Sequence, residues 1–269
     1  MKRKNNNFRA IVRCLVVVAF FFIILFTVKR VARHGLDMNQ NKKENDNLIE
    51  EVLRPIENGE DGEGDNLIDG EKPKKGSTIK PDAVSVDFNK LKTINTDVRG
   101  WIMFNGFYVN NPIVQTTNNE YYLNHTVYRG INEAGSIFMD YRNKSLEDKN
   151  VVIYGHATID RSMFGSLTDV FTSSFWSVPN ADIIYLYDIN NKLMKYQIFS
   201  YYTIESEEYY ITTTFRNDAS FQQFIDTIKG RSLQNRNVTV TASDKILTLS
   251  TCAGSSGTNM RRVIHAKRL

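Results

Sequence analysis

The sequence has almost no cysteine: Cys14 and Cys252 are the two among its 269 residues. Cys14 lies in an apolar N-terminal segment that should never meet Cys252, so we expect no intramolecular disulfide in the soluble part of the chain. Unpaired thiols are uncommon outside the cell, where disulfides form. Cys252 is therefore a candidate reactive group if that part of the chain is extracellular.

The sequence also lacks the signals of several ligand classes. It has no glycine motif that cradles phosphates, no acidic cluster with calcium-loop spacing and no run of basic and aromatic residues along a helix. The net charge of +4 comes partly from basic residues that flank the apolar segment. We therefore expect no nucleic-acid partner, no metal and no cofactor.

The apolar N-terminal segment is long enough to cross a bilayer. It runs from Cys14 to Val28, and Ile11 and Val12 extend it if Arg13 snorkels, so residues 11–28 are expected in lipid. The residues that follow have no clear small-x-small cleavage site, which favours an uncleaved anchor over a cleaved signal peptide. Five basic residues precede the apolar core and three follow it. This excess predicts a single-pass protein of the cell membrane with a cytoplasmic N-terminus and an extracellular bulk.

Composition divides the chain into three parts. Residues 1–31 form the basic tip and the transmembrane anchor, residues 32–80 a polar linker, and residues 81–269 one domain that holds both tryptophans. The linker cannot bury enough apolar surface to offset the entropy of ordering it, so it is expected to be a mobile tether. One piece of it is predicted to be helical and able to dock on the domain, because four apolar residues follow a helix face before Pro55: Leu48, Ile49, Val52 and Leu53.

Residues 81–269 are predicted to be mainly β. Apolar runs indicate strands at residues 151–154, 183–187, 193–202, 238–240, 246–251 and 263–267. One helix is indicated by Phe221, Phe224, Ile225 and Ile228, with Gly230 at the expected C-terminal cap. Several short strands with few helices favour a β-barrel or sandwich with helical insertions.

Cys252 stands at the end of one predicted strand and just before a Gly/Ser stretch, a position that suits a nucleophile. A thiolate needs a nearby base or cation. Of the four histidines, His156 is best placed, because it directly follows the buried strand at residues 151–154. A single histidine after a strand is more often a turn residue, so its position alone does not assign a role. His34 belongs to the linker, and His125 and His265 are the other two.

Arg261 and Arg262 begin the strand that follows the Cys252 loop. One of them could hold a substrate carbonyl or a developing oxyanion if the strands before and after the loop are neighbours. The alternative is an exposed arginine at the end of a strand. Side chains alternate along a strand, so only one of the pair can face the site, and the apolar pattern of the next residues does not say which.

The run Thr248 to Cys252, with Arg261 to Ala266 downstream, resembles the active-site signature of class B sortases. The resemblance covers nearly all of residues 81–269. The other matching pieces occur in the family's order: Asp97 to Ile102, Asn111 to Gln115, Tyr121 to Leu123, Gly135 to Asp140, Asn150 to His156 and Ser162 to Gly165.

This resemblance implies a sortase-like closed β-barrel with helical insertions, preceded by a transmembrane helix and a mobile tether. It places the family's nucleophile at Cys252 and its histidine at His156. Its arginine falls on Arg261, which stands four positions before the histidine of an Arg-x-Val-Val-His-like run. The same resemblance implies that this histidine, His265, is a structural residue. The adjacent Arg262 departs from the family pattern. Ser250 and Tyr154 flank the site in sequence, and either could line the substrate groove or simply pack in its strand.

The implied reaction is transpeptidation. The thiolate attacks the threonine carbonyl of a sorting motif near the C-terminus of a secreted protein, and an amine resolves the thioacyl enzyme. In the family that amine belongs to a peptidoglycan stem or cross-bridge peptide, or to a pilin lysine, so wall anchoring and pilus assembly are both open. A papain-like hydrolase is disfavoured, because its cysteine precedes its histidine and opens a helix. A surface assembly module without catalytic activity is the remaining alternative.

Overall fold

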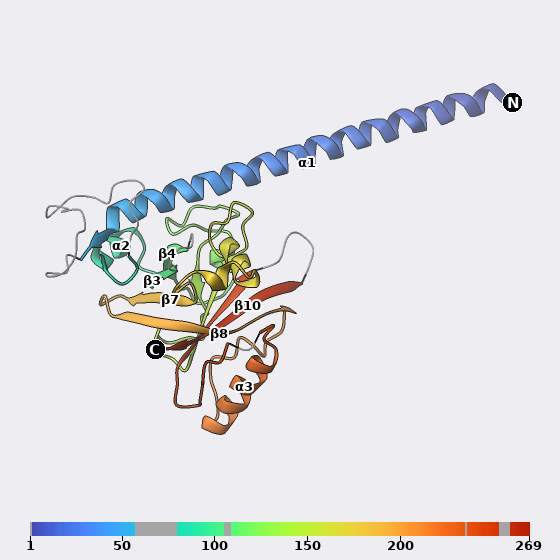
Figure 1. The fold of residues 1–269 in the computed structure, drawn as a ribbon. Coiled ribbons are helices and arrows are strands. Elements are labelled where there is room, and N and C mark those ends of the chain that lie inside the picture. Colours follow the sequence, from blue (N-terminus) through green and yellow to red (C-terminus); the bar gives the residue numbers. More distant parts are fainter. Residues whose placement is uncertain (1, 57–79, 105–108, 235, 253–258) are drawn as a thin grey trace.

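The structure, a computed structural model, describes residues 2–56, 80–104, 109–234, 236–252 and 259–269. In these residues eight strands close into a barrel in the order β10-β8-β7-β3-β4-β5-β6-β9 (Figure 1). A closed barrel has no unpaired edge. The barrel with helical insertions expected from the sequence is confirmed. Its strands are β3 (Val98–Phe104), β4 (Asn110–Val114), β5 (Phe138–Met139), β6 (Asn150–His156), β7 (Ile183–Asp188), β8 (Leu193–Glu205), β9 (Ile246–Cys252) and β10 (Met260–Arg268).

Five of the six predicted strands are confirmed, because they fall within β6, β7, β8, β9 and β10. The sixth prediction, at residues 238–240, is wrong, since that segment pairs with no strand. Both edges of β9 and of β10 are already occupied within the barrel, so no edge remains for it there. Val240 is instead buried in the apolar cluster beneath α3 (Asp218–Gly230).

Side chains of the barrel wall alternate between an apolar interior and an outer face. Ile153 of β6, Leu249 of β9 and Ile264 of β10 belong to the cluster that fills the interior. Successive residues of a strand point to opposite faces, so Tyr154 and Val263 lie on the outer face. Each of these two packs in a different outer cluster.

Two covers pack on this outer face. The first cover packs around Trp101 and meets β3, β4, β5 and β7, whereas the second cover is α3 with the chain around Tyr210, over β8, β9 and β10. Figure 1 shows α2 and α3 on different sides of the barrel. The seam between the covers lies over β6 and β9. The first cover consists of the end of α1 with β1 (Leu53–Pro55), β2 (Val84–Val86), α2 (Phe88–Ile94) and the 3-10 turn η1 (Tyr121–Leu123).

Two further 3-10 segments, η2 (Gly165–Phe171) and η3 (Phe175–Ser177), contribute to the interior rather than to the covers. Leu167 and Phe175 belong to the same apolar cluster as the inward residues of the strands. These segments therefore extend the barrel core.

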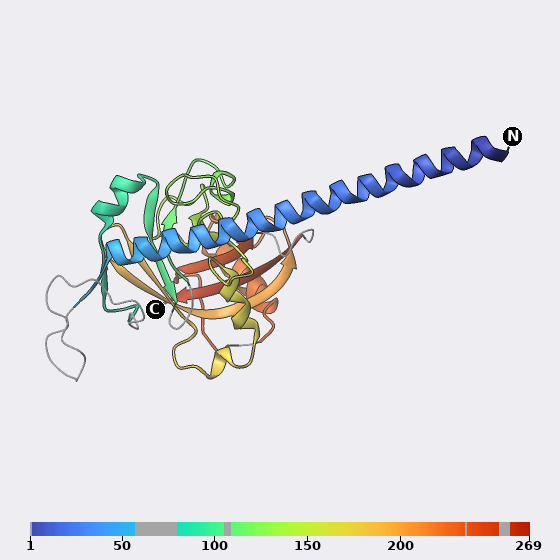
Figure 2. The same cartoon turned by 90° about the horizontal axis from the view of Figure 1, so that it is seen from above.

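α1 (Lys2–Val52) is one continuous helix whose N-terminal part stands clear of the barrel (Figures 1 and 2). Its stretch from Val12 onward is strongly apolar, and the most apolar part is not buried against the rest of the protein. By length and composition the helix can cross a membrane. This agrees with an N-terminal anchor.

The C-terminal part of α1 differs from the expected mobile tether. Residues 32–52 continue the helix, and Leu48 and Val52 are fully buried in the first cover, so the apolar face expected to dock does contact the domain. Residues 32–47 are held on the domain by polar side chains such as Asp37 and Asn41 together with the buried Met38. Their polar composition alone therefore suggested mobility. Residues 57–79 of the expected tether lie outside the described residues.

α3 forms as its apolar stripe predicts, with Phe221, Phe224, Ile225 and Ile228 buried. Asn217 caps its N-terminus: its side chain accepts a hydrogen bond from the Ser220 backbone N–H, and its own backbone N–H donates to Ser220 Oγ. The cap predicted at Gly230 is wrong. Gly230 is the last helical residue, and Arg231 takes the C-cap position with a φ of −80°.

His265 lies on the outer face of β10 and is fully buried beneath α3. Its Nε2 lies 2.8 Å from the Tyr202 hydroxyl and its Nδ1 lies 2.9 Å from Thr248 Oγ1. The Thr248 hydroxyl donates to Asn150 Oδ1 at 2.7 Å, so it accepts from His265 Nδ1–H. Nε2 then accepts from Tyr202, and the ring is neutral. Burial lowers the pKa of His265 to about 3.

We expect the protein to lose stability as the pH falls from 7 toward 5. The unfolded chain binds a proton at His265 with a pKa of about 6.5, whereas the folded protein does so only near pH 3. Linkage then lowers the free energy of unfolding by about 2 kcal/mol over this window. Urea unfolding at pH 7 and pH 5 should show a smaller pH dependence in His265→Gln than in the wild type. Equal pH dependence would contradict this account.

Candidate active site

β9 ends at Cys252, and its pairing with β6 brings His156 to the same position along the sheet. The two strands are parallel, and their register pairs His156 with Cys252, as it pairs Tyr154 with Ser250. Residues that alternate with the interior set lie on the outer face. The two positions therefore end the outer face of neighbouring strands, at the seam between the covers.

β10 pairs with the other side of β9 and carries the arginines. The antiparallel register places Val263 opposite Ser250. The pairing with β9 ends at that pair, and its continuation by two residues along each strand would bring Arg261 opposite Cys252. Residues directly opposite on antiparallel strands share a face. With this continuation, positions 156, 252 and 261 form one row across three adjacent strands, which we call the terminal row.

Arg262 does not belong to this row. It alternates with Arg261, and its backbone N–H donates to Thr251 Oγ1 at 2.9 Å. Both arginines are half-buried, and Arg261 Nη1 donates to the Met260 carbonyl at 3.2 Å. The backbone pairing therefore separates the two arginines where the apolar pattern of the sequence could not.

His156 is half-buried and held by a backbone carbonyl. Its Nε2 lies 2.6 Å from the carbonyl oxygen of Leu123, and because a carbonyl can only accept, this nitrogen carries a proton. Burial lowers the pKa of His156 below its ordinary value, and the hydrogen bond to Leu123 offsets only part of this effect. The neutral ring is thus the Nε2–H tautomer.

The Leu123 carbonyl is a feature that the sequence did not reveal, because a backbone group has no residue type of its own. It ends η1, which is held by the Ser136 N–H donating to the Tyr122 carbonyl at 3.0 Å. Gly135 packs its backbone against this turn with a φ of +60°. A Cβ there would lie 2.5 Å from the Tyr122 oxygen and 2.8 Å from the Leu123 oxygen.

Tyr154 lies one row below the terminal row, and its hydroxyl is hydrogen-bonded. It donates to Asp140 Oδ2 at 2.7 Å, and Arg142 Nε and Nη2 donate to the same carboxylate at 2.8 and 2.7 Å. Burial raises the pKa of Tyr154, and the negative charge of Asp140 raises it further. Asp140 is fully buried, and this network fixes the ring of Tyr154 on the outer face of β6.

Ser250 pairs with Tyr154 in the same lower row and is 1% exposed. Its hydroxyl lies 3.3 Å from the hydroxyl of the buried Tyr210, which belongs to the second cover. Sequence reasoning missed Tyr210, because nothing in its local pattern marks it. Tyr154 and Ser250, which the sequence offered as groove residues, are therefore neighbours. The hydroxyl of Tyr154 is hydrogen-bonded to Asp140 and that of Ser250 to Tyr210.

The other three histidines lie outside the terminal row. His34 of α1 pairs through Nδ1 with Glu133 Oε2 at 2.9 Å. The ring of His125 stacks on that of Tyr121 with centroids 4.0 Å apart, and its Nδ1 lies 2.8 Å from the Tyr121 carbonyl. His265 is buried beneath α3.

The chain is similar to known proteins over most of its length. The family model described as the sortase domain matches residues 104–269. Sortase B of Staphylococcus aureus (strain NCTC 8325 / PS 47) is 38% identical over 185 residues, which are 67% of this chain and 73% of that protein. Sortase B of Listeria monocytogenes is 35% identical over 167 residues, or 62% of this chain and 67% of the relative.

Solved structures extend the similarity to the fold. The crystal structure of sortase B from B. anthracis in complex with AAEK1 is 31% identical with a TM-score of 0.69, and the match covers 87% of this chain and 99% of that one. The Staphylococcus aureus sortase B–substrate complex is 38% identical with a TM-score of 0.63, covering 68% of this chain and 84% of the other.

Gly135→Ala is expected to disturb His156 from a distance. The added Cβ meets two carbonyl oxygens and a positive φ, which should lower the free energy of unfolding by about 1–3 kcal/mol. The Leu123 carbonyl must move, so the pKa of His156 should fall further, because a hydrogen bond that raises it is weakened. Urea unfolding and NMR titration of the His156 ring measure the two effects.

The matched control is Gly230→Ala, where a Cβ meets nothing within 4 Å. It should leave the pKa of His156 unchanged. If the pKa of His156 is also unchanged in Gly135→Ala, Gly135 and the His156 ring are not coupled.

Proposed function

Because the chain belongs to the sortase family and is a class B cysteine transpeptidase, we propose that it anchors secreted proteins to the cell wall. In this proposal it cleaves a C-terminal sorting motif at a threonine carbonyl and transfers the protein to an amine of peptidoglycan. The observation that carries the proposal is the terminal row, in which the register pairs position 156 with position 252 and the continued β10–β9 pairing brings position 261 beside them.

Cys252 is the proposed nucleophile. Its thiolate attacks the threonine carbonyl carbon, and the electron pair of the C=O bond moves to oxygen. When the tetrahedral intermediate collapses, the C–N bond breaks and a thioester remains on sulfur. The incoming amine then attacks the thioester carbon, the C–S bond breaks and the thiolate returns.

His156 is the proposed acid and base of both steps. The Leu123 carbonyl holds its Nε2–H, so Nδ1 is the nitrogen at which a proton is gained or lost. The protonated ring gives this proton to the departing amide nitrogen. The neutral ring then takes one from the attacking amine, which balances the protons over the cycle.

Arg261 is the proposed oxyanion group. A guanidinium donates charge-assisted hydrogen bonds and stays charged throughout, so it stabilises the negative oxygen of each tetrahedral intermediate. The register supports Arg261 over Arg262, because only Arg261 continues the row of Cys252.

Tyr154 and Ser250 are the proposed floor of the peptide groove. Their hydroxyls are engaged by Asp140 and Tyr210, so a peptide would meet the ring face of Tyr154 and the shape of the floor rather than free hydroxyl donors. The S. aureus relative was solved as a substrate complex, which supports a sorting-motif peptide as partner.

α1 is the proposed membrane anchor, with residues 11–28 in lipid, the N-terminus in the cytoplasm and the catalytic domain outside the cell. The apolar stretch of α1 supports an anchor, since none of its most apolar part is buried against the rest of the protein. We retain residues 1–31 as the anchor, 32–80 as the linker and 81–269 as the catalytic domain. Within the linker, residues 32–52 form a docked helix.

Acylation of Cys252 tests the proposed function directly. The full chain in detergent micelles is incubated with a panel of sorting peptides and analysed by mass spectrometry of its tryptic peptides. We expect one peptide class to leave an acyl adduct on Cys252 and none on Cys14, and an added peptidoglycan-type amine to release it. Release only by a lysine-containing pilin peptide would favour pilus assembly. Absence of any adduct on a folded protein with an alkylatable thiol would overturn the proposal.

The two arginines form a matched pair for a second test. Arg261→Ala should lower kcat/KM by about a hundredfold or more, the usual effect of removing an oxyanion donor. Arg262→Ala should stay within about threefold of the wild type, as for a substitution away from the site. Steady-state kinetics with the acylating peptide measure both. A larger loss in Arg262→Ala would reverse the assignment.

A further inference from the structure

α1 contacts the loop that precedes β5 at several points along its docked half. His34 pairs with Glu133, and the Asn132 side chain donates to the Asp37 carbonyl at 2.9 Å. One turn further along, Asn41 Nδ2 donates to the carbonyl of Gly135 at 2.9 Å. This series of contacts fixes residues 132–135 to the same helix that carries the apolar stretch.

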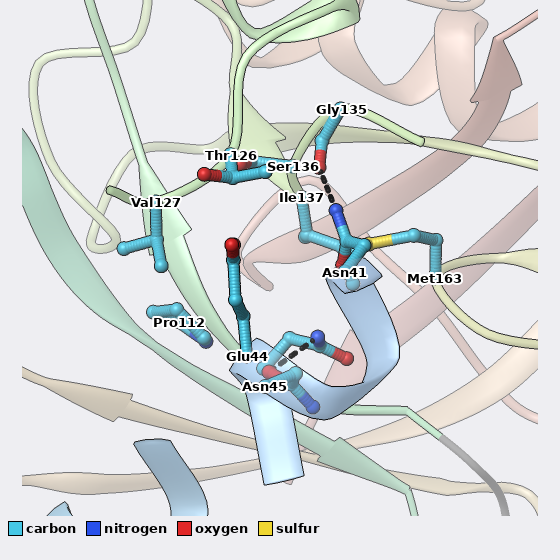
Figure 3. Close-up of a pocket in the computed structure, with 11 residues that line it drawn as sticks. Asn41, Glu44, Asn45, Pro112, Thr126, Val127, Gly135, Ser136, Ile137 and Met163 are labelled. Atoms are coloured by element: carbon cyan, nitrogen blue, oxygen red, sulfur yellow. Dashed lines mark hydrogen bonds between the residues drawn. The ribbon is translucent and has the colours of Figure 1, made fainter. Parts of the chain in front are cut away.

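The Asn41 contact is buried. Asn41 is 4% exposed, and Figure 3 shows it between Gly135 and Met163, with its dashed hydrogen bond to the glycine carbonyl. The small cavity beside it is lined on one side by Glu44 and Asn45 of α1. On the other side it is lined by Ser136 and Ile137, which follow Gly135. A buried carbonyl that loses its donor is costly, so this bond fixes where Gly135 lies.

Gly135 in turn sets the position of the Leu123 carbonyl. The two are in direct backbone contact, since a Cβ on Gly135 would lie 2.8 Å from the Leu123 oxygen. The neighbouring Ser136 N–H holds the Tyr122 carbonyl of the same turn. The Leu123 carbonyl then accepts from His156 Nε2 at 2.6 Å. Asn41, Gly135, Leu123 and His156 thus form one chain of contacts from the helix to the ring.

We propose that Asn41 is a positioning residue for His156, so that the docked half of the anchor helix is part of the catalytic apparatus. The proposal rests on the function proposed above, in which His156 transfers the protons. The bond of Asn41 to Gly135 keeps the Leu123 carbonyl in place, and the carbonyl keeps Nδ1 of the ring directed at the reaction. A membrane anchor that served only as an attachment would have no such effect on catalysis.

The test uses the full chain in nanodiscs with the peptide that acylates Cys252. Asn41→Ala should lower kcat about tenfold and leave KM within about twofold, because the histidine is misplaced while the peptide groove is unchanged. The ring ¹⁵N resonances of His156 should shift in the same variant, since Nε2–H loses its fixed acceptor. Asn47→Ala is the matched control, because Asn47 is exposed on the same helix. It should retain wild-type kcat and resonances.

Asp37→Ala guards against a variant that fails to fold. Asp37 is half-exposed, and its Oδ2 accepts from the Glu133 N–H at 3.2 Å, so its removal loosens the same loop without opening a buried site. We expect a smaller loss of kcat, about twofold to threefold, and a resonance shift in the same direction. Wild-type kcat and unchanged His156 resonances in both variants would overturn the proposal. A loss of thermal stability without any change in kcat or in these resonances would overturn it as well.

Failure of this proposal is distinguishable from failure of the function itself. If Cys252→Ala and His156→Ala abolish transfer while Asn41→Ala and Asp37→Ala retain wild-type kcat, only the role of Asn41 is refuted. If Cys252→Ala retains transfer, the proposed chemistry is wrong, and the role of Asn41 falls with it.

Discussion

The parallel pairing of β6 with β9 is the constraint on which the candidate site depends. The two strands are far apart in the sequence, and both end at the row of His156 and Cys252. A slip of one residue would set His156 against Thr251 and place the two positions on opposite faces. The register is held on the outer face by the Thr248 hydroxyl, which donates to Asn150 Oδ1. It is also held by closure of the barrel, which fixes both neighbours of each strand.

The two covers determine which part of this outer face can be a groove. The first cover supplies the Leu123 carbonyl to His156, and the second supplies the Tyr210 hydroxyl to Ser250. Arg142 links the Asp140 carboxylate to the second cover. Its Nη2 donates both to that carboxylate and, at 2.9 Å, to the carbonyl of Ile211. A buried carboxylate is tolerable only when its hydrogen bonds are satisfied. The hydrogen bonds of Arg142 that satisfy Asp140 therefore also fix the second cover beside Tyr154.

The sequence was informative where a residue type carries the signal. Apolar runs located the strands that end at the site, and the ordered motifs identified Cys252 and His156 as candidates. The alternation of apolar and polar residues along β10 did not separate Arg261 from Arg262, because of His265. This polar residue lies on the outer face and is nevertheless fully buried by α3. Outer and inner residues of β10 thus look equally apolar. The docking of residues 32–47 was missed for the opposite reason, since polar side chains such as Asn41 make its contacts.

His156 and His265 lie on the same outer face, and their partners give them different chemistry. Both nitrogens of His265 are engaged, one donating to Thr248 and one accepting from Tyr202, so a second proton would break the network. The partner of His156 is a carbonyl, which accepts from Nε2–H in the neutral and in the protonated ring alike. Protonation at Nδ1 therefore leaves that bond intact. A backbone carbonyl can hold a histidine still while the ring gains and loses a proton, which is what the proposed transfer requires.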